Sequence, residues 1–356
     1  MNIYFFFHLI IFYINNLIYN NYLYIKKMKF TKFNHIVVFG GSQITLEFLK
    51  LLKKKKINFH YFTNKRQLSD NLINNSSLKN NLKKNEIRFF ETEDINKNKL
   101  IKKVFTGRSL GLGFGQPWVF KKELLKLMNP NLVDFMGIPL PKFRGGAHYT
   151  WMILNKNFTG GCFIQNINEN TIQGASDSGS YYDYTYYNYP RNLKTPKDFF
   201  NYSVLKEINF LKKFLKKISN DNSFRLKKFN KKDSVYFPRL ISKLNSFINW
   251  DLNIDELVRF INAFSDPYPG AITFLNNRKV YLKNARIHKN NNFHSYSAGI
   301  ITNIYEKKLF ICAKGGIIKA TGIFLGNKKS INKLKIGDRF STELKLLQLA
   351  KIHKKF

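Results

Sequence analysis

The residues best placed to do chemistry lie at one corner of the chain, where an apolar run breaks into prolines, an arginine and glycines. Residues 132–151 read LVDFMGIPLPKFRGGAHYTW, and the segment becomes aromatic and helix-like after the two glycines. In an open α/β sheet, ligands bind at the carboxyl ends of the strands, so a strand that ends in a rigid, glycine-rich loop is a candidate site. A purely structural turn is the alternative interpretation.

A second candidate ligand contact is the stretch VFTGRSLGLGFG at residues 104–115. Its alternating glycines permit a flat ligand to approach the backbone closely, although a flexible turn requires glycines equally. The Gly40-Gly41 pair is a weaker signal, because it is not a full GxGxxG motif and is typical of a plain strand-to-helix turn. The chemistry indicated is therefore binding of a planar molecule at the end of a strand.

The elements that would position these loops follow the pattern of a doubly wound parallel sheet. The text HIVVFGGSQ and ITLEFLKLLKKKK predicts a buried strand, a glycine turn and an amphipathic helix, and residues 58–63 predict the next strand. Further strands are expected at 87–90, 104–115, 132–137 and 159–166, and helices are expected at 147–155 and at about 196–219. These elements indicate a Rossmann-like α/β domain.

The later part of the chain has a different pattern. After a predicted helix at 254–264 come the short β-like segments AITFL, KVYLKNARI, SAGIITNIY, KLFICA and IIKATGIF, separated by Gly and Asn turns. Such spacing favours a small barrel. We therefore predict a Rossmann-like domain at 33–222, a charged linker at 223–233 and a smaller C-terminal β-barrel (OB-like) domain at 234–347.

Composition narrows the classes of function only in part. The formal net charge of +38 comes mainly from lysines that are spread along the chain, so it permits an RNA partner without indicating one. Cys162 and Cys312 have no second cysteine or histidine at metal-ligand spacing, so we expect no metal site, no disulfide framework and a cytoplasmic location. The apolar run in residues 1–27 is too short to span a bilayer, and we predict an over-long start there rather than a membrane anchor.

Four segments together carry a family resemblance. PLPKFRGGAHYTWMILN, TGGCFIQNIN, the D-x-G at Asp177 to Gly179, and INW...ELVRFINAFSDPYPGA occur in the order found in the formyltransferase family, over roughly residues 33–347. The sequence resembles both the methionyl-tRNA formyltransferase branch and the sugar-amine branch, as a divergent member. The resemblance implies transfer of a formyl group from 10-formyltetrahydrofolate to a primary amine, with no membrane partner.

The resemblance also implies which residues bind folate. In the family, the pterin is wrapped largely by backbone groups of the strand-end loops. The corresponding positions in this sequence are Gly111, Gly113, Phe114, Trp118, Pro141, Arg144 and Gly145. Two alternatives stay open: the aromatic rings belong to the core, and Arg144 braces its loop instead of holding a carboxylate or phosphate.

The catalytic positions depart from the family pattern. The family has N-x-H before the LP dipeptide, and this chain has Asp134 and Met136 there. A methionine cannot transfer a proton, and an ionised Asp134 would repel a developing oxyanion unless burial keeps it protonated. Asp177 matches the family's acidic position, or is a surface residue. His148 can serve as a substitute base, or is structural.

Two interpretations of function follow. The first is an active formyltransferase that uses Asp177, Asp134 and His148 as its catalytic residues, with a small amine or amino-sugar as the first candidate acceptor and methionyl-tRNA as the second. The second is a catalytically impaired relative that binds folate or another ligand. The sequence does not identify the acceptor, the oligomeric state or the start of translation.

Overall fold

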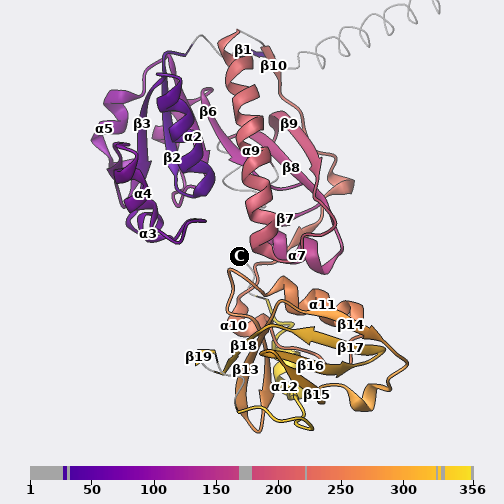
Figure 1. The fold of residues 1–356 in the computed structure, drawn as a ribbon. Helices are drawn as coiled ribbons and strands as arrows, with labels where there is room; N and C mark the ends of the chain where they lie inside the picture. Colours follow the sequence, from indigo (N-terminus) through magenta and orange to yellow (C-terminus); the bar gives the residue numbers. More distant parts are fainter. Residues whose placement is uncertain are drawn as a thin grey trace, which may run out of the picture. The chain divides into compact units, whose positions relative to one another are not determined.

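The chain folds into two compact units whose sequences interleave. The computed structural model describes residues 27–29, 33–167, 179–220, 223–325, 328–329 and 333–353. The N-terminal unit contains the described residues of Met1–Met136, Cys162–Thr185 and Ile208–Phe229, and the C-terminal unit contains those of Gly137–Gly161, Tyr186–Glu207 and Asn230–Phe356 (Figure 1). We expected consecutive domains. Instead, residues 140–146 (LPKFRGG), here called the LP corner, belong to the C-terminal unit and contribute to its core.

A seven-stranded sheet with the order β4-β3-β2-β5-β6-β8-β9 confirms the predicted Rossmann-like architecture. Strands β2 to β6 pair in parallel and β8 runs antiparallel to β6. The strands are β2 (His35–Gly40), β3 (Asn58–Thr63), β4 (Phe90–Glu91), β5 (Ser109–Phe114), β6 (Leu132–Met136), β8 (Thr159–Asn166) and β9 (Tyr181–Asn188). Because β2 is followed by β3 on one side and by β5 on the other, the strand order reverses between β2 and β5.

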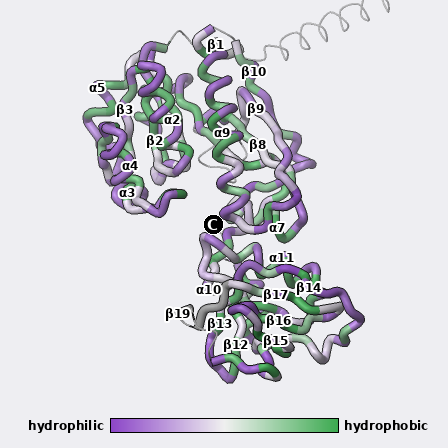
Figure 2. Tube along the Cα trace, viewed as in Figure 1, coloured by the Kyte–Doolittle hydropathy of each residue, from purple (hydrophilic) through white to green (hydrophobic). Residues whose placement is uncertain are grey.

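Helices connect the parallel strands. Helix α2 begins at a Ser42 cap whose side chain accepts a hydrogen bond from the Thr45 N–H, and it buries an apolar stripe that includes Phe48 and Leu52. The helices before β6 are α2 (Gln43–Lys54), α3 (Lys65–Ser69), α4 (Leu78–Lys84), the 3-10 turn η1 (Ile95–Lys97), α5 (Lys99–Val104) and α6 (Lys122–Met128). The buried residues of these helices are mostly apolar, and hydrophobic and hydrophilic residues alternate along them (Figure 2).

The long helix α9 (Pro196–Ser219) contributes its first half, up to Glu207, to the C-terminal unit and its second half, from Ile208, to the N-terminal unit (Figure 1). Thr195 and Asp198 cap its start reciprocally, because each backbone N–H donates to the other's side chain, at 2.9 and 3.3 Å. Past its end, β10 (Ser223–Arg225) pairs antiparallel with β1 (Lys27–Lys29), and η2 (Lys231–Asp233) follows. The segment expected to be a linker, residues 223–233, therefore contains the short strand β10 and the 3-10 turn η2.

The C-terminal unit holds the predicted antiparallel strands, arranged as two four-stranded sheets with the orders β12-β13-β18-β19 and β14-β17-β16-β15. The strands are β12 (Ala271–Leu275), β13 (Arg278–Lys283), β14 (Arg286–Asn290), β15 (Ile301–Tyr305), β16 (Lys308–Ala313), β17 (Gly316–Ala320), β18 (Gly322–Leu325) and β19 (Lys328–Lys329). Around them lie α10 (Ser242–Asn245), α11 (Ile254–Ala263), the 3-10 turn η3 (Ser295–Ser297) and α12 (Leu344–Leu349).

One hydrophobic core joins these sheets to the segment after the LP corner. Met152 of α7 (His148–Leu154) and Phe199 of α9 are buried in the same cluster as Leu257 of α11 and Leu282 of β13. The hydroxyl of Thr150 donates a hydrogen bond to the Ala263 carbonyl at 3.1 Å, which ties α7 to the end of α11. Burial of this shared apolar surface holds the corner against the C-terminal sheets.

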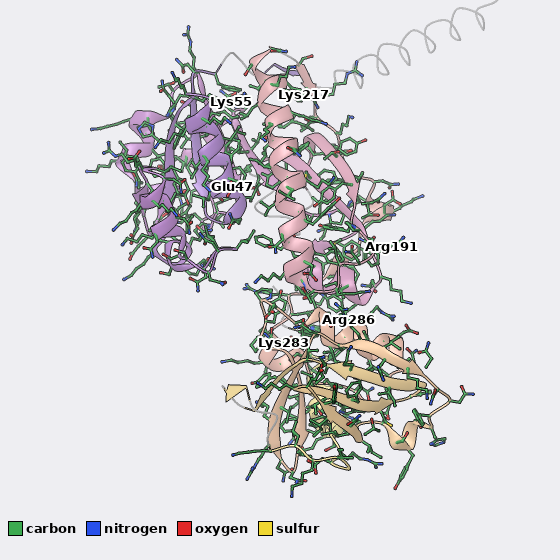
Figure 3. All side chains as sticks on the ribbon, viewed as in Figure 1. Glu47, Lys55, Arg191, Lys217, Lys283 and Arg286 are labelled. Carbon is green, nitrogen blue, oxygen red and sulfur yellow. The ribbon has the colours of Figure 1, made fainter. Side chains whose placement is uncertain are left out.

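The chain carries 60 lysine and arginine residues against 22 aspartate and glutamate residues. Lysine and arginine side chains project from both units, as Lys55, Lys217 and Arg286 illustrate (Figure 3). Among the described residues, no helix is long and apolar enough to cross a membrane, and no cluster of three or more His, Cys, Asp or Glu side chains could hold a metal ion.

Candidate functional site

The loops after β2 and β5 are joined by hydrogen bonds at the point where the strand order reverses. The Gly41 N–H donates to the Phe114 carbonyl at 3.3 Å, and the Gln67 side chain donates to the carbonyls of Gly41 and Gly115. Gly40 has a φ of +102°, and a Cβ there would overlap the Phe114 carbonyl oxygen. The Gly40 turn is therefore a tight strand-to-helix turn, as the sequence indicated.

Gly113 and Asp134 lie opposite each other in the parallel pairing of β5 and β6. The space where Gly113 would carry a Cβ is occupied by polar atoms: the Gln116 Oε1 overlaps that position, and the Asp134 Oδ1 lies 2.8 Å from it. The missing side chain of Gly113 therefore allows an amide and a carboxylate to lie over the carboxyl end of β5. Sequence reasoning found Gly113 and Asp134 but missed Gln116, although a polar residue directly after GFG at a strand end was a usable signal.

The Gln116 Oε1 is a buried acceptor that receives no hydrogen bond from any described residue. A buried polar atom left without a partner costs about 1–3 kcal/mol, so its position fits a ligand that brings an N–H donor. A planar heterocycle with N–H groups, such as a pterin, has that chemistry. The residues over Gly113 thus fit the type of ligand expected from the sequence.

Of the other residues expected near the pterin, Gly111 and Phe114 are buried in the core, whereas Trp118 is partly buried. The Cβ position of Gly111 is filled by Leu132 and Phe105. The ring of Phe114 is 3% exposed, and Trp118 donates from its Nε1–H to the Glu93 carbonyl at 2.8 Å. Any contact that Gly111 or Phe114 makes with a ligand would therefore involve the backbone, and the folate contacts of these residues stay predictions.

The LP corner is braced from a distant segment of the same unit. Strand β7 (Arg144–Gly145) pairs in parallel with β11 (Tyr236–Phe237), and the Pro141 carbonyl accepts a hydrogen bond from the Val235 N–H at 3.1 Å. The Arg144 Nη1 donates to the Ser234 hydroxyl at 2.7 Å. These contacts favour the interpretation of Arg144 as a brace, and its role toward an anion stays a prediction.

His148 is the first residue of α7, and its ring lies against Tyr149 with the centroids 4.0 Å apart. Its Nε2 is buried and has no hydrogen-bond partner in the described part of the chain. Burial lowers the pKa of His148 to about 4, so the imidazole is neutral at physiological pH. A neutral imidazole can accept or donate a proton, but its burial also suits the structural alternative.

A carboxyl group missed by sequence reasoning lies where β6 leaves the sheet. Gly137 follows Met136 directly, and a Cβ on Gly137 would overlap the Glu207 Oε1. Glu207 belongs to the buried stripe of α9 and is only 4% exposed. Burial raises the pKa of Glu207 to about 8. The signal in the sequence was a glutamate at a stripe position, between Val204 and Leu211.

The predicted site residues are divided between the two units in the sequence. The N-terminal unit supplies Asp134 with the folate-binding candidates of β5, and the C-terminal unit supplies His148 with the residues of the LP corner. Asp177 lies outside the described residues.

Comparisons of the sequence point to one family. Residues 240–338 match the family described as formyl transferase, C-terminal domain. The methionyl-tRNA formyltransferase of Prochlorococcus marinus is 24% identical over 310 residues, which cover 82% of this chain and 88% of that protein. The methionyl-tRNA formyltransferase of Mycoplasma mycoides is 28% identical over 246 residues, or 64% of this chain and 72% of that protein.

Solved structures share the fold. The sugar 3N-formyl transferase WlaRD, solved with dTDP and 5-N-formyl-THF, superposes with a TM-score of 0.59 at 19% identity, over 85% of this chain and 99% of that one. The N-formyltransferase of Helicobacter canadensis, in complex with folinic acid and dTDP-3-aminofucose, gives a TM-score of 0.58 at 18% identity, over 82% and 100%. These likenesses agree with the resemblance carried by the LP corner and the PYPGA segment.

Proposed function

We propose that this chain, which is similar to formyltransferases in sequence and fold, transfers a formyl group from 10-formyltetrahydrofolate to a primary amine. The observation that carries the proposal is the arrangement at the end of β5, where the missing side chain of Gly113 leaves room for Gln116 and Asp134. The buried, unbonded oxygen of Gln116 fits an N–H of the pterin. The bound folate supplies the formyl carbon.

The chain's own residues would then handle the proton and the charge of the transfer. The formyl oxygen would gain negative charge as the nitrogen of the acceptor amine bonds to the formyl carbon. As the bond from that carbon to the folate nitrogen then breaks, the oxygen would become a carbonyl again, the acceptor nitrogen would have lost a proton and the folate nitrogen would have gained one. Asp134 is at the strand end next to Gly113 and is our candidate to orient the amine and accept its proton. Asp177 and His148 remain candidates for the same proton transfer.

A small amine or amino-sugar is our first candidate acceptor, and methionyl-tRNA is the second. The sugar N-formyltransferases that share the fold support the first, and the methionyl-tRNA formyltransferases found by sequence support the second. The even spread of basic side chains over both units provides no separate support for tRNA (Figure 3). Formylation of an amino-sugar nucleotide but not of methionyl-tRNA would decide for the first.

The alternative function is folate binding without turnover, and the observation that favours it is Met136 at the end of β6. A thioether neither donates nor carries a proton. Calorimetric titration with a stable formyltetrahydrofolate analogue, followed by turnover assays with both acceptor classes, separates the two functions. Binding with turnover supports the transferase and binding alone supports the alternative, whereas absence of binding contradicts both.

Substitution of Gly113 by alanine is expected to weaken binding of the folate analogue about tenfold or more, since a lost hydrogen bond to a buried group costs about 1–3 kcal/mol. The added Cβ would displace the Gln116 amide and the Asp134 carboxylate. Gly107→Ala is the matched control, because nothing lies within 4 Å of its Cβ position. Calorimetry would measure the affinity of both variants for the folate analogue. Equal affinities would show that the analogue does not contact Gln116 and Asp134 beside Gly113.

A further inference from the structure

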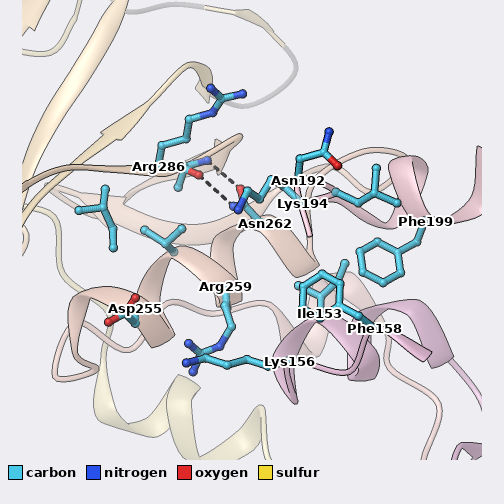
Figure 4. A pocket seen from close by; sticks show the side chains of 14 residues that line it. Ile153, Lys156, Phe158, Asn192, Lys194, Phe199, Asp255, Arg259, Asn262 and Arg286 are labelled. Atoms are coloured by element: carbon cyan, nitrogen blue, oxygen red, sulfur yellow. Dashed lines mark hydrogen bonds between the residues drawn. The ribbon is translucent and has the colours of Figure 1, made fainter. Parts of the chain in front are cut away.

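A cavity of about 600 Å³ lies within the C-terminal unit, between α7, the start of α9, α11 and the beginning of β14 (Figure 4). All of its lining residues belong to this one unit, and none of them is a candidate for formyl transfer. Cavities of this size are typical of sites for small molecules. The shape therefore permits a ligand, and the lining determines which chemistry it would have.

The charged part of the lining is strongly basic. Lys156, Lys194, Arg259 and Arg286 line the cavity, and Asp255 is its only carboxylate. None of the four cations forms an ion pair with a described residue. With four cations and one carboxylate, the lining has a net charge of +3. These positive charges attract an anion, and without an anion they repel one another.

Arg259 provides the second observation. Its Nε is buried, and within the described ranges the guanidinium makes no hydrogen bond at all. Lys156 lines the same cavity, and in the view of Figure 4 its side chain extends toward Arg259. A buried guanidinium N–H without an acceptor is costly, and an oxyanion between the two cations would satisfy both.

The opposite part of the lining is apolar. Ile153, Phe158 and Phe199 lie together there, with the two phenyl rings 5.8 Å apart between centroids (Figure 4). Such a wall gains free energy when it covers the hydrocarbon or ring body of a ligand. Phe158 is the partly buried member of this wall, whereas Ile153 and Phe199 are 7% and 1% exposed, so a ligand would gain its apolar contact mainly from Phe158.

We propose that this cavity binds a phosphorylated small molecule, with the phosphate held by Arg259 and Lys156 and the organic body against Ile153, Phe158 and Phe199. A guanidinium presents a planar fork of donors that matches phosphate oxygens, and the lysine adds a point charge. This cavity is separate from the group formed by Gly113, Gln116 and Asp134 at the end of β5, and the proposal does not depend on formyl transfer.

Calorimetric titration of the full chain with phenyl phosphate, inorganic phosphate and phenol tests the proposal. Phenyl phosphate is expected to bind one to one at millimolar concentration or below, about tenfold more tightly than inorganic phosphate, and phenol is expected not to bind. Equal affinity for the two phosphates would overturn the apolar half of the proposal. Absence of binding by both phosphates would overturn the whole.

Variants localise the binding. Arg259→Gln and Lys156→Gln are each expected to weaken phenyl phosphate about tenfold, the loss for one charge-assisted contact. Lys156 is exposed, so its variant keeps the fold even where Arg259→Gln alters packing. Arg278→Gln, an exposed cation of β13 outside the cavity, is the matched control and should leave the affinity unchanged. An equal loss in all three variants would assign the binding to diffuse charge and overturn the proposal.

Discussion

Replacement of Met136 by histidine is expected to raise the rate of formyl transfer about 100-fold, the lower end of what general acid–base catalysis contributes. Met136 ends β6, two residues after the Asp134 that faces Gly113. Its thioether cannot take up or release a proton, whereas an imidazole titrates close to neutral pH. The measurement is kcat and KM for the best amine acceptor, and the gain should be in kcat.

The control for this prediction is Met136→Leu, which keeps an apolar side chain of similar volume and should leave the rate unchanged. Asp134→Ala should lower kcat about 100-fold if that carboxylate takes part in the reaction. If the histidine variant gains nothing while Asp134→Ala loses activity, proton transfer is already supplied by another group. If neither variant changes a measurable rate, Asp134 has no catalytic role.

Substitution of Glu207 by glutamine is expected to stabilise the protein at and above pH 8 and to flatten the dependence of its stability on pH. The pKa of Glu207 is raised to about 8 in the folded state by burial, against 4.5 as its ordinary value. The folded state therefore keeps a proton that the unfolded chain releases between these values. The stabilising contribution of Glu207 is complete below pH 4.5 and is lost as the pH rises through about 8.

The size of this effect follows from the shift. A difference of one pKa unit corresponds to about 1.4 kcal/mol, so the penalty at high pH is on the order of several kcal/mol. Thermal unfolding from pH 5 to 9 measures it, and Glu91→Gln, an exposed residue of β4, is the control. Parallel curves for Glu207→Gln and the wild type would contradict the burial of an unpaired carboxyl beside Gly137.

Most of the architecture could be predicted from the sequence. The strand and helix periods of residues 35–63 reflect local burial that repeats along one chain segment, so β2, α2 and β3 appear where the pattern indicates. The short β-like segments after residue 270 likewise indicated antiparallel strands. The LP corner and the PYPGA segment carried the resemblance to formyltransferases, because their residue types are specific in combination.

The composition of the site was less accessible. Asp134 and Gly113 were found because the resemblance to formyltransferases points to these two positions, and the structure pairs them in neighbouring parallel strands. Gln116 and Glu207 were missed, because nothing local in GFGQ or in α9 indicates which atoms fill the space beside a glycine. Only the packing of neighbouring elements decides that.

The sequence by itself therefore determined the class of fold, the resemblance to formyltransferases, and the presence of Asp134 and Met136 where that family has Asn and His. The tertiary structure decided what these residues contact, which unit the LP corner belongs to, and that α7, α9, α11 and β14 enclose a basic cavity. The physical reason is sequence separation. Periodicity reports burial along one segment, whereas Lys156 and Arg259 are brought together only by the core that α7 and α11 share.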